Sequence, residues 1–384
     1  MRQQSGDISL LRKLNSAATL RILREIGPAT YTELAKQARI SRPTVEAVID
    51  DLLSDGWAEE CEEHEQEQGE RRRGRPARRF RFRASTGHVA GVTVGRSAIR
   101  AMISDLSGRI VGNHRRPLPA DLPAAERVEA IAQLVERAAS DAGLTVAALV
   151  AVGVGTTGVV DGEGRVVKSV ALAGWSGRHL QAELRERLGV PVTVENDMRL
   201  AVLAEHWRGA AQGLSNVVYL FTAADRIGMG LLIGGVPYRG AHAASGEIGR
   251  QPNGNWIAYR PVIEFAMAEE PGELRSAGQS VEFTIVKAEL GEPRAVAAVR
   301  EFARGLAAGL ITVVNPLDPE MVVIGGSLSH AGDLLVPPIQ EMLDEYCLYP
   351  PRVVASELGA EGITLGAIRF ALNQAEQLLF TVTG

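Results

Sequence analysis

Arginines dominate one short segment of the sequence, residues 71–79, which reads Arg-Arg-Arg-Gly-Arg-Pro-Ala-Arg-Arg. Glycine and proline keep such a segment extended and slim, so flanking arginines can enter the narrow minor groove of A·T-rich DNA. We therefore predict that Arg73, Gly74, Arg75 and Pro76 contact DNA. The alternative is a basic linker that only neutralises the acidic run before it.

The residues before this segment carry the apolar spacing of three helices. Gly27-Pro28 ends the first helix, and Thr30 with Glu33 forms a capping box for a short second helix. Ser41 is a good N-cap for the third helix, which ends at Asp55-Gly56. Two short helices joined by a tight turn indicate a helix-turn-helix, whose second helix enters the major groove of DNA.

The start of that third helix supplies the candidate base readers. Arg42, Pro43, Thr44 and Glu46 lie near its N-terminal end, away from its apolar stripe. Arg42 is the best candidate to contact guanine or a phosphate. The alternative is a three-helix interaction module, because short helix-turn-helix patterns also occur without DNA binding.

Two strand patterns extend this module into a winged helix. One strand begins at residues 57–59, and the returning strand at 79–83 alternates arginines with Phe80 and Phe82. The stretch around the turn carries seven carboxylates, which we interpret as a solvated, mobile loop: Glu59, Glu60, Glu62, Glu63, Glu65, Glu67 and Glu70. The basic Gly-Pro core resembles an AT-hook. Both the helix-turn-helix pattern and the basic wing indicate DNA binding. We therefore predict that residues 1–85 form a winged helix-turn-helix DNA-binding domain.

The charge of the chain is unevenly distributed. The 384 residues carry a net charge of −5, but residues 1–83 hold 16 basic and 14 acidic side chains, which leaves 25 against 32 in the rest. Any contact with nucleic acid must therefore come from a local patch. The only cysteines, Cys61 and Cys347, cannot form a disulfide framework and fit a reducing cytosol. We found no apolar run long enough to span a bilayer, and we expect a cytoplasmic protein.

After the first domain, one pattern of strands and helices occurs twice. Three short strand patterns within residues 89–111 are followed by a helix at 124–142 and by two buried strands. A similar plan begins at Asn216 and includes a helix at 296–314 and a strand that ends in the glycine pair 325–326. Two halves that each open with a strand meander predict a duplicated, two-lobed α/β fold with a cleft between the lobes.

Four motifs in this part occur in the order seen in the ROK family (repressors, open reading frames and kinases). They are Gly91-Val92-Thr93-Val94-Gly95, Glu195-Asn196-Asp197, Gly246-Glu247-Ile248-Gly249 and Ile324-Gly325-Gly326. The first domain resembles that of the family's transcriptional regulators, so the resemblance covers essentially the whole chain. It implies a winged helix-turn-helix followed by an actin-like ATPase (ribonuclease-H-like) ROK domain. The expected bounds are 86–203 for lobe I, with a C-terminal helix at 364–384 returning to it, and 204–363 for lobe II.

A ROK kinase needs a carboxylate base and glycine-rich turns that approach the ATP phosphates. By resemblance, Asp197 matches the base. The family's Gly-Thr-Gly run falls on Ala224, Asp225 and Arg226. Asp225 puts negative charge where a phosphate should lie, and Arg226 puts bulk where backbone N–H groups should point. We therefore expect no enzymatic activity, and a sugar kinase remains the less favoured alternative.

The resemblance also implies an effector pocket. Asn196, Asp197 and Glu247 would hydrogen-bond sugar hydroxyls, since each buried hydroxyl needs a partner. Glu264 matches a further sugar-binding glutamate of the family. The alternative is that these residues only maintain the fold that the family shares and bind no ligand. The regulator would then be controlled by a protein partner.

The family's zinc ligands are missing from the sequence. Arg250 stands at the place of a family histidine, and no cysteine lies between Cys61 and Cys347. Thiolates and imidazoles are what such a site requires, so we expect no metal and no cofactor. Arg250 either recognises an anionic substituent of the effector, such as a phosphate, or lies on the surface.

Together these patterns predict a DNA-binding transcriptional regulator, a repressor of carbohydrate-metabolism genes whose effector is a sugar or sugar derivative. Its expected partners are double-stranded DNA, as an inverted-repeat operator with A·T-rich flanks, and a second copy of the chain in a homodimer or larger oligomer.

Overall fold

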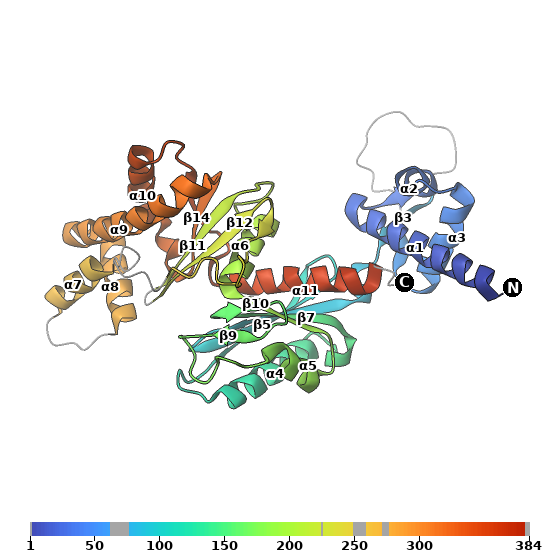
Figure 1. Cartoon of the computed structure of the whole chain (residues 1–384), viewed down its shortest axis with the longest axis horizontal. Coiled ribbons are helices and arrows are strands. Elements are labelled where there is room, and N and C mark those ends of the chain that lie inside the picture. The colour runs from blue at the N-terminus through green and yellow to red at the C-terminus, as the bar shows by residue number, and fades with distance from the viewer. Residues whose placement is uncertain (1, 62–76, 224–225, 249–258, 271–275, 381–384) are drawn as a thin grey trace.

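The computed structural model describes residues 2–61, 77–223, 226–248, 259–270 and 276–380 (Figure 1). A helical N-terminal domain lies at one end of the molecule, and two sheets with their helices make up the rest (Figure 1). The long C-terminal helix, α11, runs from the two-lobed part toward the N-terminal domain (Figure 1).

The N-terminal domain combines three helices with a small sheet of order β1-β3-β2. Its elements are α1 (Arg2–Ile26), β1 (Ala29–Thr30), α2 (Tyr31–Ala38), α3 (Arg42–Ser54), β2 (Ala58–Cys61) and β3 (Arg79–Phe82). The predicted caps are present: Thr30 and Glu33 form a full capping box, and the Ser41 hydroxyl accepts from the Thr44 backbone N–H. Leu34 and Phe80 are completely buried in the core between the helices and the sheet.

Lobe I is a five-stranded sheet of order β10-β7-β4-β5-β6. Its strands are β4 (His88–Val94), β5 (Ala98–Asp105), β6 (Ile110–Pro117), β7 (Leu149–Thr156) and β10 (Val192–Asn196). Helices α4 (Ala124–Asp141) and α5 (Leu180–Leu188) cover one face, where Val92 is buried. Helix α11 (Gly362–Phe380) covers the other face, where Val89 is buried, and α6 (Asp197–Arg208) packs beside it. The side chains of β4 alternate between these faces because of the strand period of two.

Lobe II repeats this topology with the order β13-β12-β11-β14-β15. Its strands are β11 (Val217–Ala223), β12 (Arg226–Ile233), β13 (Val236–Pro237), β14 (Met321–Gly325) and β15 (Arg352–Ala355). Its helices are α7 (Arg260–Glu269), α8 (Ala277–Glu289), α9 (Pro293–Leu317) and α10 (Gly332–Tyr346). Smaller elements in the two lobes and the linker are the hairpin β8 (Val159–Val160) and β9 (Val166–Lys168), and the 3₁₀ turns η1 (Ala84–Thr86), η2 (Val146–Ala148), η3 (Ser327–Ala331) and η4 (Gly359–Glu361). In each lobe an antiparallel meander is followed by two parallel strands, so the predicted duplicated fold is confirmed.

Helix α11 approaches the lobe I sheet so closely that two strand positions require glycine. A Cβ atom on Gly91 would lie 2.6 Å from the backbone nitrogen of Ile368, and one on Gly153 would lie 2.2 Å from the carbonyl oxygen of Ala367. At its other end, α11 reaches the N-terminal domain, where Leu379 packs against that domain's core. One helix therefore contacts both the sheet of lobe I and the helix-turn-helix domain.

Candidate DNA-binding surface and effector pocket

The start of α3 presents the predicted base readers, and two of them bind each other. Arg42 and Pro43 are exposed. The Nε atom of Arg42 donates to Oε1 of Glu46 at 2.9 Å, one helical turn further on. The Thr44 hydroxyl lies 2.7 Å from the Ser41 hydroxyl within the N-cap. The Arg42–Glu46 ion pair is exposed to solvent, and such pairs are weak. Arg42 can therefore leave Glu46 at little cost in free energy and bind a base edge or a phosphate instead.

The described part of the wing carries opposite charges on neighbouring strands. Arg81 lies opposite Glu59 in the β2–β3 ladder and donates to it at 2.6 Å. Arg78 donates two hydrogen bonds of 2.8 Å to Glu60. The interpretation of Glu59 and Glu60 as part of a solvated loop was therefore wrong, because antiparallel pairing brings each carboxylate against an arginine. The predicted DNA contacts at residues 73–76 and the other five carboxylates lie outside the described residues.

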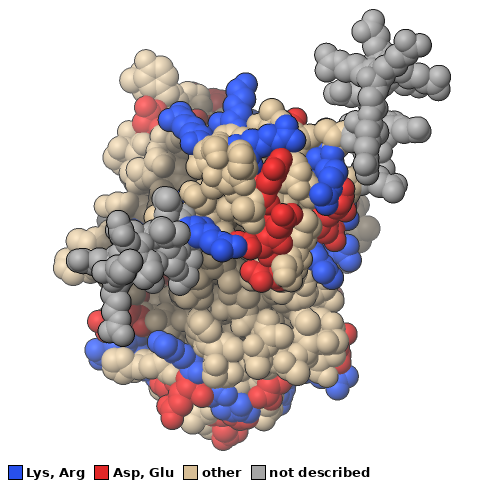
Figure 2. All heavy atoms as spheres, turned by 90° about the vertical axis from the view of Figure 1, so that its right-hand side faces the viewer, with Lys and Arg blue, Asp and Glu red and all other residues tan. Residues whose placement is uncertain are grey.

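Figure 2 shows the end of the molecule that carries the N-terminal domain. Lys and Arg side chains lie around a group of Asp and Glu side chains there, so the visible face has mixed charge (Figure 2). This agrees with the sequence argument that DNA binding depends on a local set of arginines.

A pocket of about 360 Å³ lies between the lobes and is called the interlobe pocket below. Lobe I lines it with residues 157–159, 168–171 and 196–198, and lobe II with residues 226–229, 246–248 and Tyr259. The structure thereby brings together three of the predicted effector ligands, Asn196, Asp197 and Glu247, which come from both sides of the cleft.

Asn196 ends strand β10 and caps helix α6. Its side-chain oxygen accepts from the backbone N–H groups of Met198 and Arg199 at 2.9 and 3.2 Å. Its amide nitrogen donates to the carbonyl oxygen of Gly158 at 2.9 Å. Asn196 therefore fixes the pocket wall, because its oxygen is already occupied by the helix start.

Asp197 is almost completely buried, and an arginine from lobe II covers it. Nη1 of Arg226 lies 2.9 Å from Oδ2 of Asp197, while the guanidinium stacks 4.6 Å from the ring centroid of Phe221. The Tyr259 hydroxyl donates to the carbonyl oxygens of Ala223 and Arg226 and so holds the ends of both strands. The carboxylate that matches the kinase base is therefore engaged by a cation that comes from the predicted phosphate turn.

Glu247 lines the pocket from lobe II and keeps solvent access. Partial desolvation, followed by the nearby Asp197 carboxylate, raises the pKa of Glu247. Glu264 is not among the described residues that line the pocket: it is exposed on α7, where it pairs with Arg260 at 2.6 Å. Asp225 and Arg250 lie outside the described residues.

The lining residues that the sequence analysis did not single out include Lys168 and Tyr259. Lys168 ends the short strand β9, where no motif marks it. Tyr259 stands directly before α7 and stacks on Phe302 with ring centroids 4.9 Å apart. Both enter the pocket through tertiary packing, so sequence spacing carried no signal for them.

An ionic network centred on the buried Glu195 and Arg199 joins lobe I to the segment of lobe II that leads to Glu247. The Glu195 carboxylate accepts from Arg199 at 2.7 Å and from Arg239 at 2.5 Å. Arg199 also donates to the carbonyl oxygens of Val160 and Ala243, at 3.1 and 3.0 Å. Because Arg199 has several donors in a rigid plane, a movement of either lobe must rearrange this network.

Within the described ranges, no group of three or more His, Cys, Asp or Glu residues could hold a metal ion. The place at which the family's zinc ligands are expected, residues 249–258, is outside those ranges. Among the helices that the structure describes, none combines the length and the apolar character needed to cross a membrane.

Comparisons with known proteins give a consistent result. A model of the ROK family matches residues 89–255 and 266–374, and a model of the MarR family matches residues 13–59. A glucokinase of Streptomyces coelicolor is 30% identical over 317 residues, which span 74% of this chain and 98% of the glucokinase. A xylose repressor of Caldicellulosiruptor bescii is 21% identical over 395 residues, which span 96% of this chain and 98% of the repressor.

Among solved structures, a ROK family transcriptional regulator, a homologue of the E. coli MLC protein, superimposes with a TM-score of 0.75 at 22% identity. The match covers 98% of this chain and 100% of that one. The repressor and the regulator thus match nearly the whole chain, whereas the glucokinase matches about three quarters of it.

Proposed function

The chain belongs to the ROK family, and on that basis we propose that it is a DNA-binding transcriptional regulator, a repressor of carbohydrate-metabolism genes. Its effector is a sugar or sugar derivative that binds in the interlobe pocket. The observation that carries this proposal is the winged helix-turn-helix, matched by the MarR family model and attached to α11 of a two-lobed sugar-kinase-like domain. The similarity to a xylose repressor over 96% of the chain supports it.

We further propose that the chain is not a sugar kinase. Phosphoryl transfer needs a carboxylate that is free to take a proton from the attacking hydroxyl. Here Arg226 neutralises Asp197 at 2.9 Å, and the pair is partly shielded from water. Sugar kinase activity is the alternative function, because one of the relatives is a glucokinase.

The chemistry of the interlobe pocket favours a polar effector with several hydroxyl groups. Lys168 supplies an ammonium, whereas the guanidinium of Arg226 is paired with Asp197 at 2.9 Å. Asn196, Asp197 and Glu247 supply hydrogen-bonding groups for hydroxyls. A guanidinium or ammonium binds a phosphate or carboxylate through charge-assisted hydrogen bonds. Because the carboxylates of Asp197 and Glu247 line the same pocket, neutral sugars, sugar acids and sugar phosphates are all candidates.

Thermal-shift screening of the full chain with neutral sugars, sugar acids and sugar phosphates tests the effector site. A true effector should raise the melting temperature of the wild type but not of Asp197→Asn. Asp121→Asn, an exposed site outside the pocket, is the matched control and should behave as the wild type. If none of these compounds stabilises the well-folded protein, control by a protein partner would be favoured.

Two assays test the remaining parts of the proposal. The full chain should bind an operator fragment from its own regulated genes, and the effector identified above should change that affinity. With ATP, magnesium and a hexose panel we expect no phosphorylation. Turnover that is lost in Asp197→Asn would overturn the assignment as a non-enzyme. Ultracentrifugation with and without operator DNA tests the proposed homodimer or larger oligomer on an inverted repeat.

A further inference from the structure

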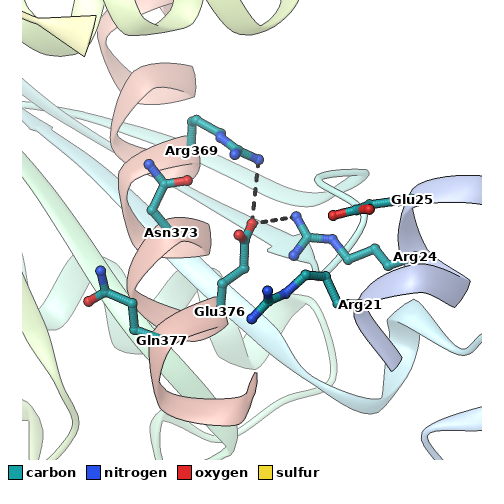
Figure 3. Close-up of a pocket in the computed structure, with 7 residues that line it drawn as sticks. All are labelled: Arg21, Arg24, Glu25, Arg369, Asn373, Glu376 and Gln377. Atoms are coloured by element: carbon teal, nitrogen blue, oxygen red, sulfur yellow. Dashed lines mark hydrogen bonds and ion pairs between the residues drawn. The ribbon is translucent and has the colours of Figure 1, made fainter. Parts of the chain in front are cut away.

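A second pocket, of about 620 Å³, lies between helices α1 and α11, where the N-terminal domain meets lobe I. We call it the interdomain pocket. Its lining residues are Arg21, Arg24 and Glu25 from α1, and Arg369, Asn373, Glu376 and Gln377 from α11 (Figure 3). All of them are polar, although the pocket lies beside the packed contact of Leu379 with the N-terminal core. Charged and amide groups at the joint between two domains can bind a polar, charged ligand.

Two guanidiniums share one carboxylate oxygen in this pocket. Oε1 of Glu376 lies 2.6 Å from Nη2 of Arg24 and 3.6 Å from Nη1 of Arg369, so the carboxylate stands between them (Figure 3). The side chains of Arg24 and Arg369 are only 22% and 28% exposed. Burial lowers the pKa of Arg369; the Glu376 carboxylate raises it in part, and the nearby Arg24 charge lowers it again. The pair of cations is therefore incompletely compensated by Glu376.

Helical spacing gathers the other groups around this triad. Arg21 precedes Arg24 by three residues, so a third guanidinium lines the same side of α1. Asn373 and Gln377 follow Arg369 at intervals of four residues and add amide groups on the same face of α11. Glu25 also lines the pocket, as an exposed residue of α1. Arginines supply forked donors for a phosphate, and amides supply neutral donors and acceptors for hydroxyls.

We propose that the interdomain pocket binds a small phosphorylated metabolite, with its phosphate on Arg24, Arg369 and Arg21 and its polar body against Asn373 and Gln377. The lining holds the guanidiniums of Arg21, Arg24 and Arg369 against the carboxylates of Glu25 and Glu376, so it has a net positive charge that favours an anion, and a phosphate monoester carries about two negative charges. This site is separate from the interlobe pocket, with which it shares no lining residue.

Occupancy would also change the contact between the two domains. The Arg24–Glu376 ion pair connects α1 of the N-terminal domain directly to α11 of lobe I. A bound phosphate competes with Glu376 for Arg24, so it replaces a direct bond by a ligand-mediated one. Binding to the pocket does not depend on the proposed function; the consequence for DNA affinity rests on it.

Isothermal titration calorimetry of the full chain at fixed ionic strength tests the binding. The probes are glycerol 3-phosphate and inorganic phosphate, with glycerol as the uncharged match. We expect both phosphates to bind and glycerol not to bind. Arg369→Met and Arg24→Met should weaken phosphate binding at least about tenfold, as the loss of a charge-assisted hydrogen bond does. Arg300→Met, which removes an exposed ion pair between α9 and α10, is the control.

Glu376→Gln keeps the proposal testable if the arginine variants fold poorly. It removes the carboxylate that competes with phosphate and should tighten phosphate binding. Misfolding would instead weaken phosphate binding, so the two effects can be told apart. Absence of phosphate binding to the wild type, or affinities that Arg24→Met and Arg369→Met leave unchanged, would overturn the proposal. If Asn196→Ala loses phosphate binding and the arginine variants do not, the phosphate binds in the interlobe pocket, and the proposal is overturned as well. A failed sugar screen or DNA assay would count against the proposed function only.

Discussion

Replacing Arg226 by methionine tests how the interlobe pocket holds its central carboxylate. The Asp197 side chain is 5% exposed and that of Arg226 is 36% exposed, with 2.9 Å between their charged atoms. The substitution keeps an unbranched chain to cover Phe221 but removes the cation. The buried Asp197 carboxylate would lose its cation but would still accept a hydrogen bond from the Met198 backbone N–H at 3.0 Å.

The size of the effect follows from the distance and the exposure. Two unit charges 2.9 Å apart attract by about 6 kcal/mol at an effective dielectric constant of about 20, which is an upper limit. Breaking a fully buried pair typically costs about 3–5 kcal/mol. Because water can reach the Arg226 side of this pair, we expect Arg226→Met to lower the free energy of unfolding by about 2 kcal/mol.

A double-mutant cycle in urea separates this pair from other effects. Wild type, Arg226→Met, Asp197→Asn and the double variant should give a coupling energy of about 2 kcal/mol. The exposed Arg260–Glu264 pair is the control, and Arg260→Met should change stability by less than about 0.5 kcal/mol. A coupling energy below about 0.5 kcal/mol for Asp197 with Arg226 would refute the reasoning that this pair holds the buried carboxylate.

Four further changes have defined outcomes. Arg42→Ala should weaken operator binding by about 1–3 kcal/mol and relax specificity at one base pair, measured by anisotropy on single-base operator variants. Arg73→Ala with Arg75→Ala should weaken binding chiefly on A·T-flanked operators and flatten its salt dependence; equal losses on G·C-flanked operators would mean that the wing contacts only phosphates. Gly153→Ala puts a Cβ atom 2.2 Å from the Ala367 carbonyl oxygen and should cost about 3 kcal/mol, so an unchanged melting temperature would contradict the close packing of α11. The raised pKa of Glu247 means that the native state holds this proton more tightly than the unfolded chain, so its ionisation lowers stability as the pH rises from the ordinary glutamate pKa through the raised one. Glu247→Gln should therefore raise the melting temperature at pH 7 and leave it unchanged at acidic pH, where both states are protonated.

Local features of the chain could be predicted because they depend on residues only a few positions apart. The capping box of Thr30 with Glu33 and the N-cap at Ser41 occur as expected. The buried strands of both lobes also occur where their apolar runs predicted them. Strand β6 is longer than expected, Ile110–Pro117 instead of residues 109–111, because a polar strand is defined by its pairing with β5 and leaves no apolar signal.

The candidate sites were only partly predictable. Sequence motifs identified Asn196, Asp197 and Glu247, which do line one pocket. They did not show that Glu264 pairs with Arg260 away from that pocket. These partners depend on how helices and strands pack, and many packings are compatible with the same spacing of residues.

The sequence by itself determined the winged helix-turn-helix and the duplicated α/β lobes, since caps and apolar periods are local properties. It also determined the membership of one family, because the family's motifs can be read directly in their order along the chain. Only the tertiary structure decided that Arg226 covers Asp197 and that α11 joins lobe I to the DNA-binding domain through Glu376. Both contacts join residues far apart in the chain, 29 positions in the first case and 352 in the second. Such pairs form where packing brings charges within a few ångströms and excludes water, and a linear sequence specifies neither condition directly.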